Sequence, residues 1–159
     1  MSAKDIIRIL QLEPHPEGGY FKETWRSGEK LVNGRGATRN LSTAIYYLLE
    51  NQDKSLFHRI GSDELWFFHG RNPVEIFLIE EGKMVVRLLG SDVEKGENPQ
   101  VLVPAGTWFS AKIRDSKGYA LVSCTVSPGF DFSDFELAVR AELIRDYPDL
   151  HATIEGFTS

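Results

Sequence analysis

Eight short apolar runs between Ser42 and Val126, separated by turn residues, are the feature that most constrains the fold of this chain. The runs are rich in β-branched and aromatic residues and follow one another about every ten residues. They read STAIYYLL, LFHRI, ELWFF, VEIFLI, KMVVRLL, QVLV, TWFSAKI and YALVSCTV. Because no helical pattern separates them, they predict an all-β protein, an antiparallel sandwich or barrel rather than alternating strands and helices.

Short helices are expected on both sides of this β-rich region. Residues 2–12 have an amphipathic pattern, and the segment LEPHPEGGYF ends it with two prolines and two glycines. Near the other end, Ser133 and Glu136 match a capping box, which predicts a helix that ends before Pro148. We therefore expect one domain over residues 1–159, with a barrel core at 42–126, an N-terminal helix and arm at 1–41 and a C-terminal helical segment at 133–156.

Charge and composition exclude several classes of partner. The formal net charge of −5 is unsuited to binding nucleic acid, and no apolar stretch approaches the ~20 residues of a membrane-spanning helix. We expect a cytoplasmic protein. The single cysteine, Cys124, cannot form an internal disulfide, and its apolar neighbours predict a buried, inert thiol.

The segment LFHRIGSDELWFFHG is the densest polar cluster within the apolar runs, and it contains His58 and Glu64. Strand alternation can turn both side chains inward, so that an imidazole and a carboxylate meet in an aromatic-walled cavity suited to proton transfer. In the alternative interpretation, His58 is a hydrogen-bonded packing residue and Glu64 is a turn carboxylate that faces water.

Other polar residues could complete such a site. Tyr46 or Tyr47, whichever faces inward, could place a phenol opposite His58, and we select Tyr46 as the candidate acid. Arg26 and Arg39 could hold an anionic group at the rim, although solvated surface arginines are the commoner case.

The cluster resembles a known family. The string HRIGSDELWFFHG is similar to the first signature motif of the cupin superfamily, which runs His-x-His, then Glu, then Gly. Here His58, Glu64 and Gly70 match that motif, while Ile60 stands where the second histidine belongs. The resemblance therefore implies a cupin fold in which one motif ligand is missing.

A second string, VLVPAGTWF, resembles the other cupin motif, Pro-x-Gly-x-x-His. Pro104 and Gly106 match it, and Phe109 stands at the histidine position. Two of the four usual metal ligands are thus absent, and two ligands are too few for a stable site. We predict no firm cofactor and no metal site, with a divalent metal kept as an alternative in which an aspartate, a glutamine such as Gln100, or water replaces the missing ligands.

Nearly the whole chain resembles the cupin-5 family, through LEPHPEGGYF, STAIYYLL, FHRIGSDELW, VPAGTWF and VSPGFDFSDFELA. This resemblance implies a jelly-roll β-barrel, or double-stranded β-helix, similar to that of dTDP-sugar epimerases, and a homodimer. In those epimerases a barrel histidine acts as base and a tyrosine as acid, and the base maps by motif onto His58.

Two further functional hypotheses follow, both with a small polar metabolite as partner. In the first, the chain is a metal-independent isomerase or epimerase of a nucleotide sugar or small carbonyl compound, with His58 as base, Glu64 orienting it and Tyr46 as acid. In the second, the chain is a non-catalytic binding protein. The cavity then holds its ligand by stacking and hydrogen bonds, and the candidate ligand-binding residues are Trp66, Phe68, Gln100 and Phe109.

Overall fold

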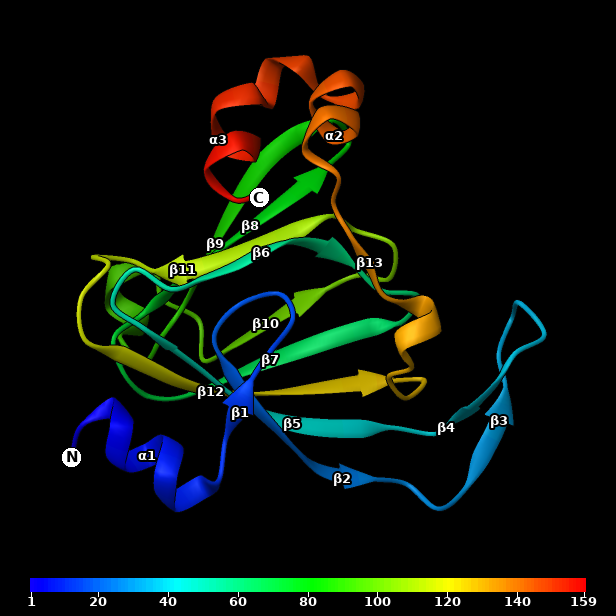
Figure 1. The fold of residues 1–159 in the computed structure, drawn as a ribbon, viewed down its shortest axis with the longest axis horizontal. Coiled ribbons are helices and arrows are strands. Elements are labelled where there is room, and N and C mark those ends of the chain that lie inside the picture. Colours follow the sequence, from blue (N-terminus) through cyan, green and yellow to red (C-terminus); the bar gives the residue numbers. More distant parts are fainter.

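The computed structural model describes residues 1–159 and consists mainly of two β-sheets that face one another (Figure 1). The six-stranded sheet has the order β1-β2-β5-β12-β7-β10, and all its neighbours are antiparallel. Its strands are β1 (Glu13–Pro14), β2 (Tyr20–Arg26), β5 (Thr43–Glu50), β12 (Tyr119–Ser127), β7 (Asp63–Arg71) and β10 (Gln100–Val103).

The five-stranded sheet has the order β13-β6-β11-β8-β9, again antiparallel throughout. Its strands are β13 (Glu136–Leu137), β6 (Lys54–Arg59), β11 (Phe109–Ile113), β8 (Val74–Glu80) and β9 (Lys83–Leu89). All eight apolar runs form strands, and from β5 to β8 successive strands alternate between the sheets. A small hairpin of β3 (Lys30–Val32) and β4 (Thr38–Asn40) projects from one end (Figure 1), and a 3₁₀ turn, η1 (Val93–Lys95), precedes β10.

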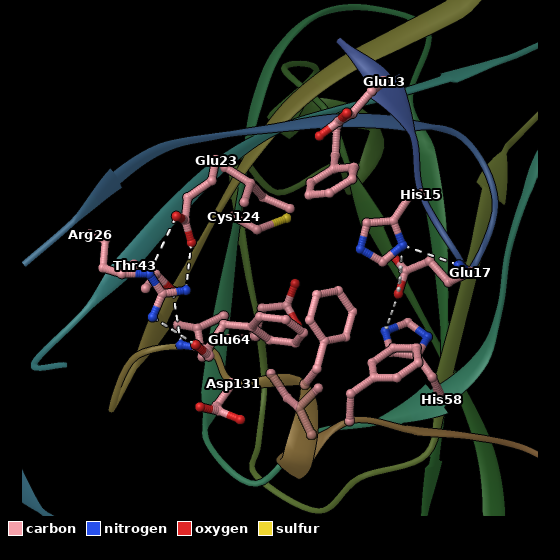
Figure 2. A pocket seen from close by; sticks show the side chains of 17 residues that line it. Glu13, His15, Glu17, Glu23, Arg26, Thr43, His58, Glu64, Cys124 and Asp131 are labelled. Carbon is pink, nitrogen blue, oxygen red and sulfur yellow. Dashed lines mark hydrogen bonds and ion pairs between the residues drawn. The ribbon is translucent and has the colours of Figure 1, made fainter. Parts of the chain in front are cut away.

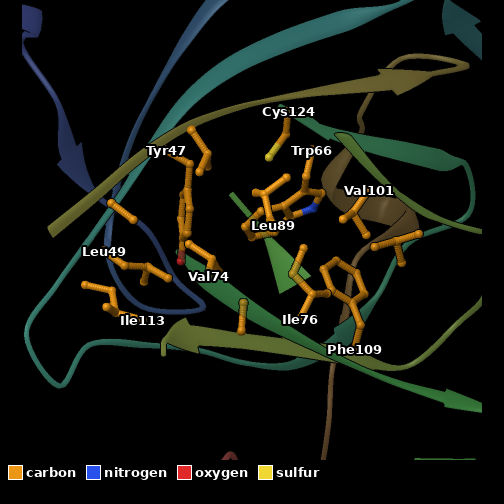
Figure 3. Packing of buried hydrophobic residues seen from close by; sticks show 14 of the residues in the cluster. Tyr47, Leu49, Trp66, Val74, Ile76, Leu89, Val101, Phe109, Ile113 and Cys124 are labelled. Atoms are coloured by element: carbon orange, nitrogen blue, oxygen red, sulfur yellow. The ribbon is translucent and has the colours of Figure 1, made fainter. Parts of the chain in front are cut away.

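The main core lies between the two sheets (Figure 3). Strand alternation produces it: along β12, Ala120, Val122 and Cys124 are buried while the residues between them are partly exposed. Trp66 from β7 and Phe109 from β11 meet in this core with ring centroids 6.2 Å apart. Cys124 is a free, buried thiol, as its apolar neighbours predicted.

The N-terminal arm contributes more β-structure than its sequence predicted. Helix α1 (Ala3–Leu10) begins with a capping box formed by Ser2 and Asp5, and it packs on the outer side of the six-stranded sheet. Strand β2 then pairs with β5 along most of its length. The sequence analysis missed β2 because its second half is exposed, so that it carries no alternation of apolar and polar residues.

The predicted helix start at Ser133 is wrong. Residues Phe132–Asp134 form a 3₁₀ turn, η2, whose cap is Asp131, and β13 then pairs with β6. The backbone N–H of Ala138 donates to the carbonyl of Phe57, so the chain is held in the sheet where a helix would need those groups.

Helical structure begins only after β13. Helix α2 (Arg140–Asp146) is followed by a 3₁₀ turn, η3 (Pro148–Leu150), and by helix α3 (His151–Gly156). Leu143 and Ile154 from these helices pack with Phe57 and Ile79 of the five-stranded sheet, so the helices cover its outer face (Figure 1). No helix has both the length and the apolar character that crossing a bilayer requires.

Candidate functional site

A cavity of about 530 Å³ opens at one end of the space between the sheets (Figure 2). Its lining combines ionisable side chains with an apolar wall that includes four phenylalanines. The ionisable lining residues are Glu13, His15, Glu17, Glu23, Arg26, His58, Glu64, Cys124 and Asp131. The phenylalanines are Phe21, Phe130, Phe132 and Phe135.

His58 projects from β6 into this cavity and forms a buried ion pair with Glu17. Its Nε2 atom lies 2.9 Å from Oε2 of Glu17, and its Nδ1 atom lies 2.7 Å from the carbonyl oxygen of Leu56. Because a carbonyl only accepts, Nδ1 carries a proton. Burial acts to lower the pKa of His58, but the charge and hydrogen bond of Glu17 outweigh it and raise the pKa above its usual value.

The pKa of Glu17 shifts in the opposite direction. Burial acts to raise its pKa, yet the charge and hydrogen bond of His58 prevail and lower it. Both shifts favour the charged forms of the pair, an imidazolium and a carboxylate. Both nitrogens of His58 are engaged, which leaves no free lone pair for a general base.

His15 stands beside Glu17 as a neutral imidazole. Burial lowers its pKa, and its Nδ1 atom accepts a hydrogen bond of 3.1 Å from the backbone N–H of Glu17. That bond fixes the tautomer with hydrogen on Nε2. Since His15 lines the cavity, its Nε2–H is available to a guest molecule (Figure 2).

Residues 15–19 form a tight turn that carries both groups into the cavity. The backbone N–H of Leu56 donates to the carbonyl of Glu17, which ties the turn to β6. Gly18 has a φ of +109°, and a Cβ atom there would lie 2.0 Å from the backbone oxygen of Lys54. Only glycine allows this close approach.

Glu64, on β7, has a raised pKa, in contrast to the lowered pKa of Glu17. Burial, followed by repulsion from Glu17, raises the pKa of Glu64 to about 7. Its residue is 7% exposed, and Figure 2 shows it between the Glu17–His58 pair and the Arg26–Glu23 pair. Glu64 therefore gains and loses its proton near neutral pH.

The two arginines considered for the rim are both occupied. Arg26 binds Glu23 through Nε and Nη2, and its Nη1 atom donates to Asn40 and to the carbonyl of Phe130. Arg39 makes a two-point contact with Asp134 and lies outside the cavity lining. Neither guanidinium is free to hold an anionic group, so that expectation is corrected.

Tyr46, the candidate acid, lies outside the cavity. It faces the outer side of the six-stranded sheet and packs near α1 with Leu48. Tyr47 is the inward residue, but its phenol donates to the carbonyl of Gly18 and its pKa is raised well above the usual value by burial. Neither tyrosine offers a phenol to a guest.

The residues predicted to bind the ligand by stacking do not line the cavity either. Trp66 and Phe109 are buried core residues, and Phe68 packs against the same core. Gln100 is exposed on β10, away from the cavity. Phe109 instead supports His58, with ring centroids 4.2 Å apart.

Of the seven predicted site residues, the structure brings only His58 and Glu64 to the cavity. The sequence analysis missed His15 and Glu17, which belong to a segment interpreted only as a loop. The signal was the string HPEGG, where two ionisable side chains precede a glycine pair that requires a special backbone.

The residues present do not fit the metal site of the cupin motifs. No three His, Cys, Asp or Glu side chains form a group that could hold a metal ion. Ile60 and Phe109 occupy the other two motif positions and offer no donor atoms. The cavity therefore lacks the ligand set that the two cupin motifs supply.

Comparison with solved structures supports the fold. A hypothetical protein from Leishmania major superposes with a TM-score of 0.93 at 38% identity, covering 99% of each chain. An uncharacterized conserved protein with a double-stranded β-helix domain from Klebsiella pneumoniae has a TM-score of 0.54 at 12% identity, covering 80% of this chain and 90% of that one. The second likeness concerns the fold alone, and it confirms the expected double-stranded β-helix architecture.

Sequence comparison points the same way. An uncharacterized protein of Saccharomyces cerevisiae is 34% identical over an alignment 147 residues long, which covers 84% of this chain and 73% of the yeast protein. The model of the Cupin_5 family, described as Cupin superfamily (DUF985), matches residues 4–138. The chain therefore belongs to the Cupin_5 family of the cupin superfamily.

Proposed function

We propose that this protein binds a small polar carbonyl compound in its cavity and catalyses proton transfer at the carbon next to the carbonyl group. One observation carries the proposal: a buried carboxyl, Glu64, faces a cavity of about 530 Å³ and has a pKa raised to about 7. A general base is most effective when its pKa lies near the working pH, and buried groups with such pKa values concentrate at functional sites.

In the proposed step, Glu64 is the base. The carbon–hydrogen bond breaks, its proton moves to a carboxylate oxygen of Glu64, and the electron pair shifts into the carbonyl to form an enolate. Return of the proton from Glu64 to the former carbonyl carbon, with the hydroxyl proton of an α-hydroxy substrate moving to the enolate oxygen, completes an isomerisation; an epimerisation additionally requires the enolate to turn its other face to Glu64. No metal or redox partner is needed for this balance.

His15 would act as the hydrogen-bond donor to the enolate oxygen. Its tautomer presents Nε2–H to the cavity. The N–H of a neutral imidazole can donate a hydrogen bond to a developing oxyanion and stabilise it. The Glu17–His58 pair then has a positioning role, since Glu17 orders the turn that carries His15 and its charge raises the pKa of Glu64.

The charge distribution argues against a nucleotide sugar as substrate. A diphosphate needs cationic partners, yet Arg26 is occupied by Glu23 and His58 by Glu17. The cavity is lined by five carboxyl groups. A small carbonyl compound without phosphate groups fits this environment better.

Solvent-deuterium exchange tests the proposed reaction. The intact protein is incubated in D₂O with a panel of small ketones and aldehydes that carry hydroxyl or amino groups, and exchange is followed by NMR. We expect exchange into at least one member, lost in Glu64→Gln and retained in Glu13→Gln, which changes an exposed acid of the same cavity. Exchange that persists in Glu64→Gln would rule out this base.

A non-catalytic binding protein is the second candidate. It is favoured by the engagement of His58 and Tyr47 with protein groups, which leaves few side chains free to act as an acid. A member of the panel that raises the melting temperature without exchanging its hydrogens would support binding alone.

A further inference from the structure

The ionisable residues of the cavity are unevenly paired. Glu17 and Glu23 are neutralised by His58 and Arg26, with N–O distances of 2.9 and 2.6 Å. The other three carboxyl groups of the lining, those of Glu13, Glu64 and Asp131, have no ion-pair partner. An anionic guest would meet unpaired negative charge and no free cation.

Of these three carboxyl groups, only that of Glu64 belongs to a buried residue. It is more than nine-tenths buried, and its polar side-chain neighbours, the thiol of Cys124 and the indole N–H of Trp66, supply no positive charge. A buried carboxyl without a cationic partner is uncommon in folded proteins, and at a cavity wall it indicates where a guest supplies the missing contact.

Aromatic rings surround the same space. Phe130 and Phe132 meet edge to face with centroids 4.9 Å apart, and Phe135 lies 6.3 and 6.1 Å from them. All three line the cavity beside Asp131. Rings and carboxylates together are the combination that attracts ammonium groups, through cation–π and ionic contacts.

We propose that the guest of this cavity carries an organic cation, an ammonium or quaternary ammonium group held by Glu64 and Asp131 against the phenylalanine rings. This inference deepens the proposed function, because it names the charged group that the carbonyl compound would carry. The substrate class becomes an amino-carbonyl compound rather than a sugar phosphate or a nucleotide sugar.

Three probes of one shape test the charge preference directly. Choline is a quaternary ammonium alcohol, 3,3-dimethylbutan-1-ol is its neutral carbon analogue, and 3,3-dimethylbutanoate is an anion of similar size. Binding of each to the intact protein is measured by NMR titration at pH 8, where Glu64 is mostly ionised. We expect choline to bind about tenfold more tightly than the alcohol, a difference of about 1.4 kcal/mol, and the anion to bind most weakly.

Variants locate the effect. Asp131→Asn keeps the cap of η2 and removes the charge, so choline affinity should fall about three- to tenfold while the affinity for the alcohol stays unchanged. Phe132→Leu should weaken choline more than the alcohol. Glu94→Gln, an exposed acid remote from the cavity, is the matched control and should change neither.

Equal or weaker binding of choline relative to the alcohol, no choline binding at millimolar concentrations, or choline affinity unchanged in Asp131→Asn would each overturn the inference. Choline and the alcohol have no carbonyl group, and the anion has only a carboxylate, whose neighbouring hydrogens are far less acidic than those of a ketone, so binding is scored separately from chemistry. A preference for choline with no exchange activity in the ketone panel would leave the ligand class standing and refute the proton transfer.

Discussion

The Nε2 atom of His58 lies 2.9 Å from a carboxylate oxygen of Glu17, which joins the N-terminal arm to strand β6 through a buried ion pair. This contact changes the role of the histidine that the cupin motif singles out. His58 is held charged by Glu17 and by the Leu56 carbonyl, so it acts as a fixed part of the wall. Glu64 has a pKa raised to about 7 and titrates near neutral pH.

Removing the charge of Glu17 should destabilise the protein and lower the pKa of His58. In Glu17→Gln the buried imidazolium loses its counter-ion, and breaking one side of a buried pair costs about 3–5 kcal/mol. The His58 contribution is fully present below pH 6.5 and is lost as pH rises through its raised folded pKa. The stability difference in urea unfolding should therefore be larger at pH 6 than at pH 9.

The control for this measurement is Glu13→Gln. Glu13 lines the same cavity but is exposed and unpaired, so its substitution should change stability by less than about 0.5 kcal/mol. A loss in Glu17→Gln that is equal at pH 6 and pH 9 would contradict the ion pair and indicate a purely steric role.

Glu64→Gln should make the protein more stable in alkaline solution. The pKa of Glu64 is raised from 4.5 to about 7, so folding is opposed progressively as pH rises from 4.5 to about 7 and by a constant amount above that range. A neutral amide removes this cost, which is about 3 kcal/mol. Urea unfolding should show a gain at pH 8 that disappears near pH 4, whereas a gain independent of pH would disprove the raised pKa.

Gly18→Ala should disrupt the turn that carries His15 and Glu17. The new methyl group would lie 2.0 Å from the backbone oxygen of Lys54, and we expect a loss of about 3 kcal/mol or more. Gly36→Ala is the matched control, because Gly36 also has a positive φ, +78°, but has open space around it. Its cost should be about 1–2 kcal/mol in thermal or urea unfolding. An equal loss of stability in Gly18→Ala and Gly36→Ala would contradict this prediction, because it would mean that the backbone moves to relieve the contact with Lys54.

Tyr47→Phe should cost about 1–3 kcal/mol, because it leaves the carbonyl of Gly18 without its buried donor. Tyr46→Phe should be nearly neutral, since the Tyr46 hydroxyl makes no hydrogen bond within the protein and lies on the outer side of the sheet. The comparison is made by urea unfolding. The opposite ranking would show that the tyrosine facing inward has been misidentified.

The strands of the core were predictable because each is short, rich in β-branched and aromatic residues, and bounded by turn residues. The eight runs from Ser42 to Val126 become β5 to β12 with small changes at their ends. The facing direction of STAIYYLL was not predictable, because both of its faces are apolar. One face, with Tyr47, meets the core, and the other, with Tyr46, is covered by α1.

The sequence by itself determined the β-rich fold, the family and the presence of His58 and Glu64 in one polar cluster, since these depend on local pattern and short motifs. The tertiary structure decided the rest of the site. Glu17 lies 41 positions before His58, and only the folding of the 15–19 turn against β6 brings the two within hydrogen-bond distance. Protonation states followed from that contact, because charge and burial act through space and not along the chain.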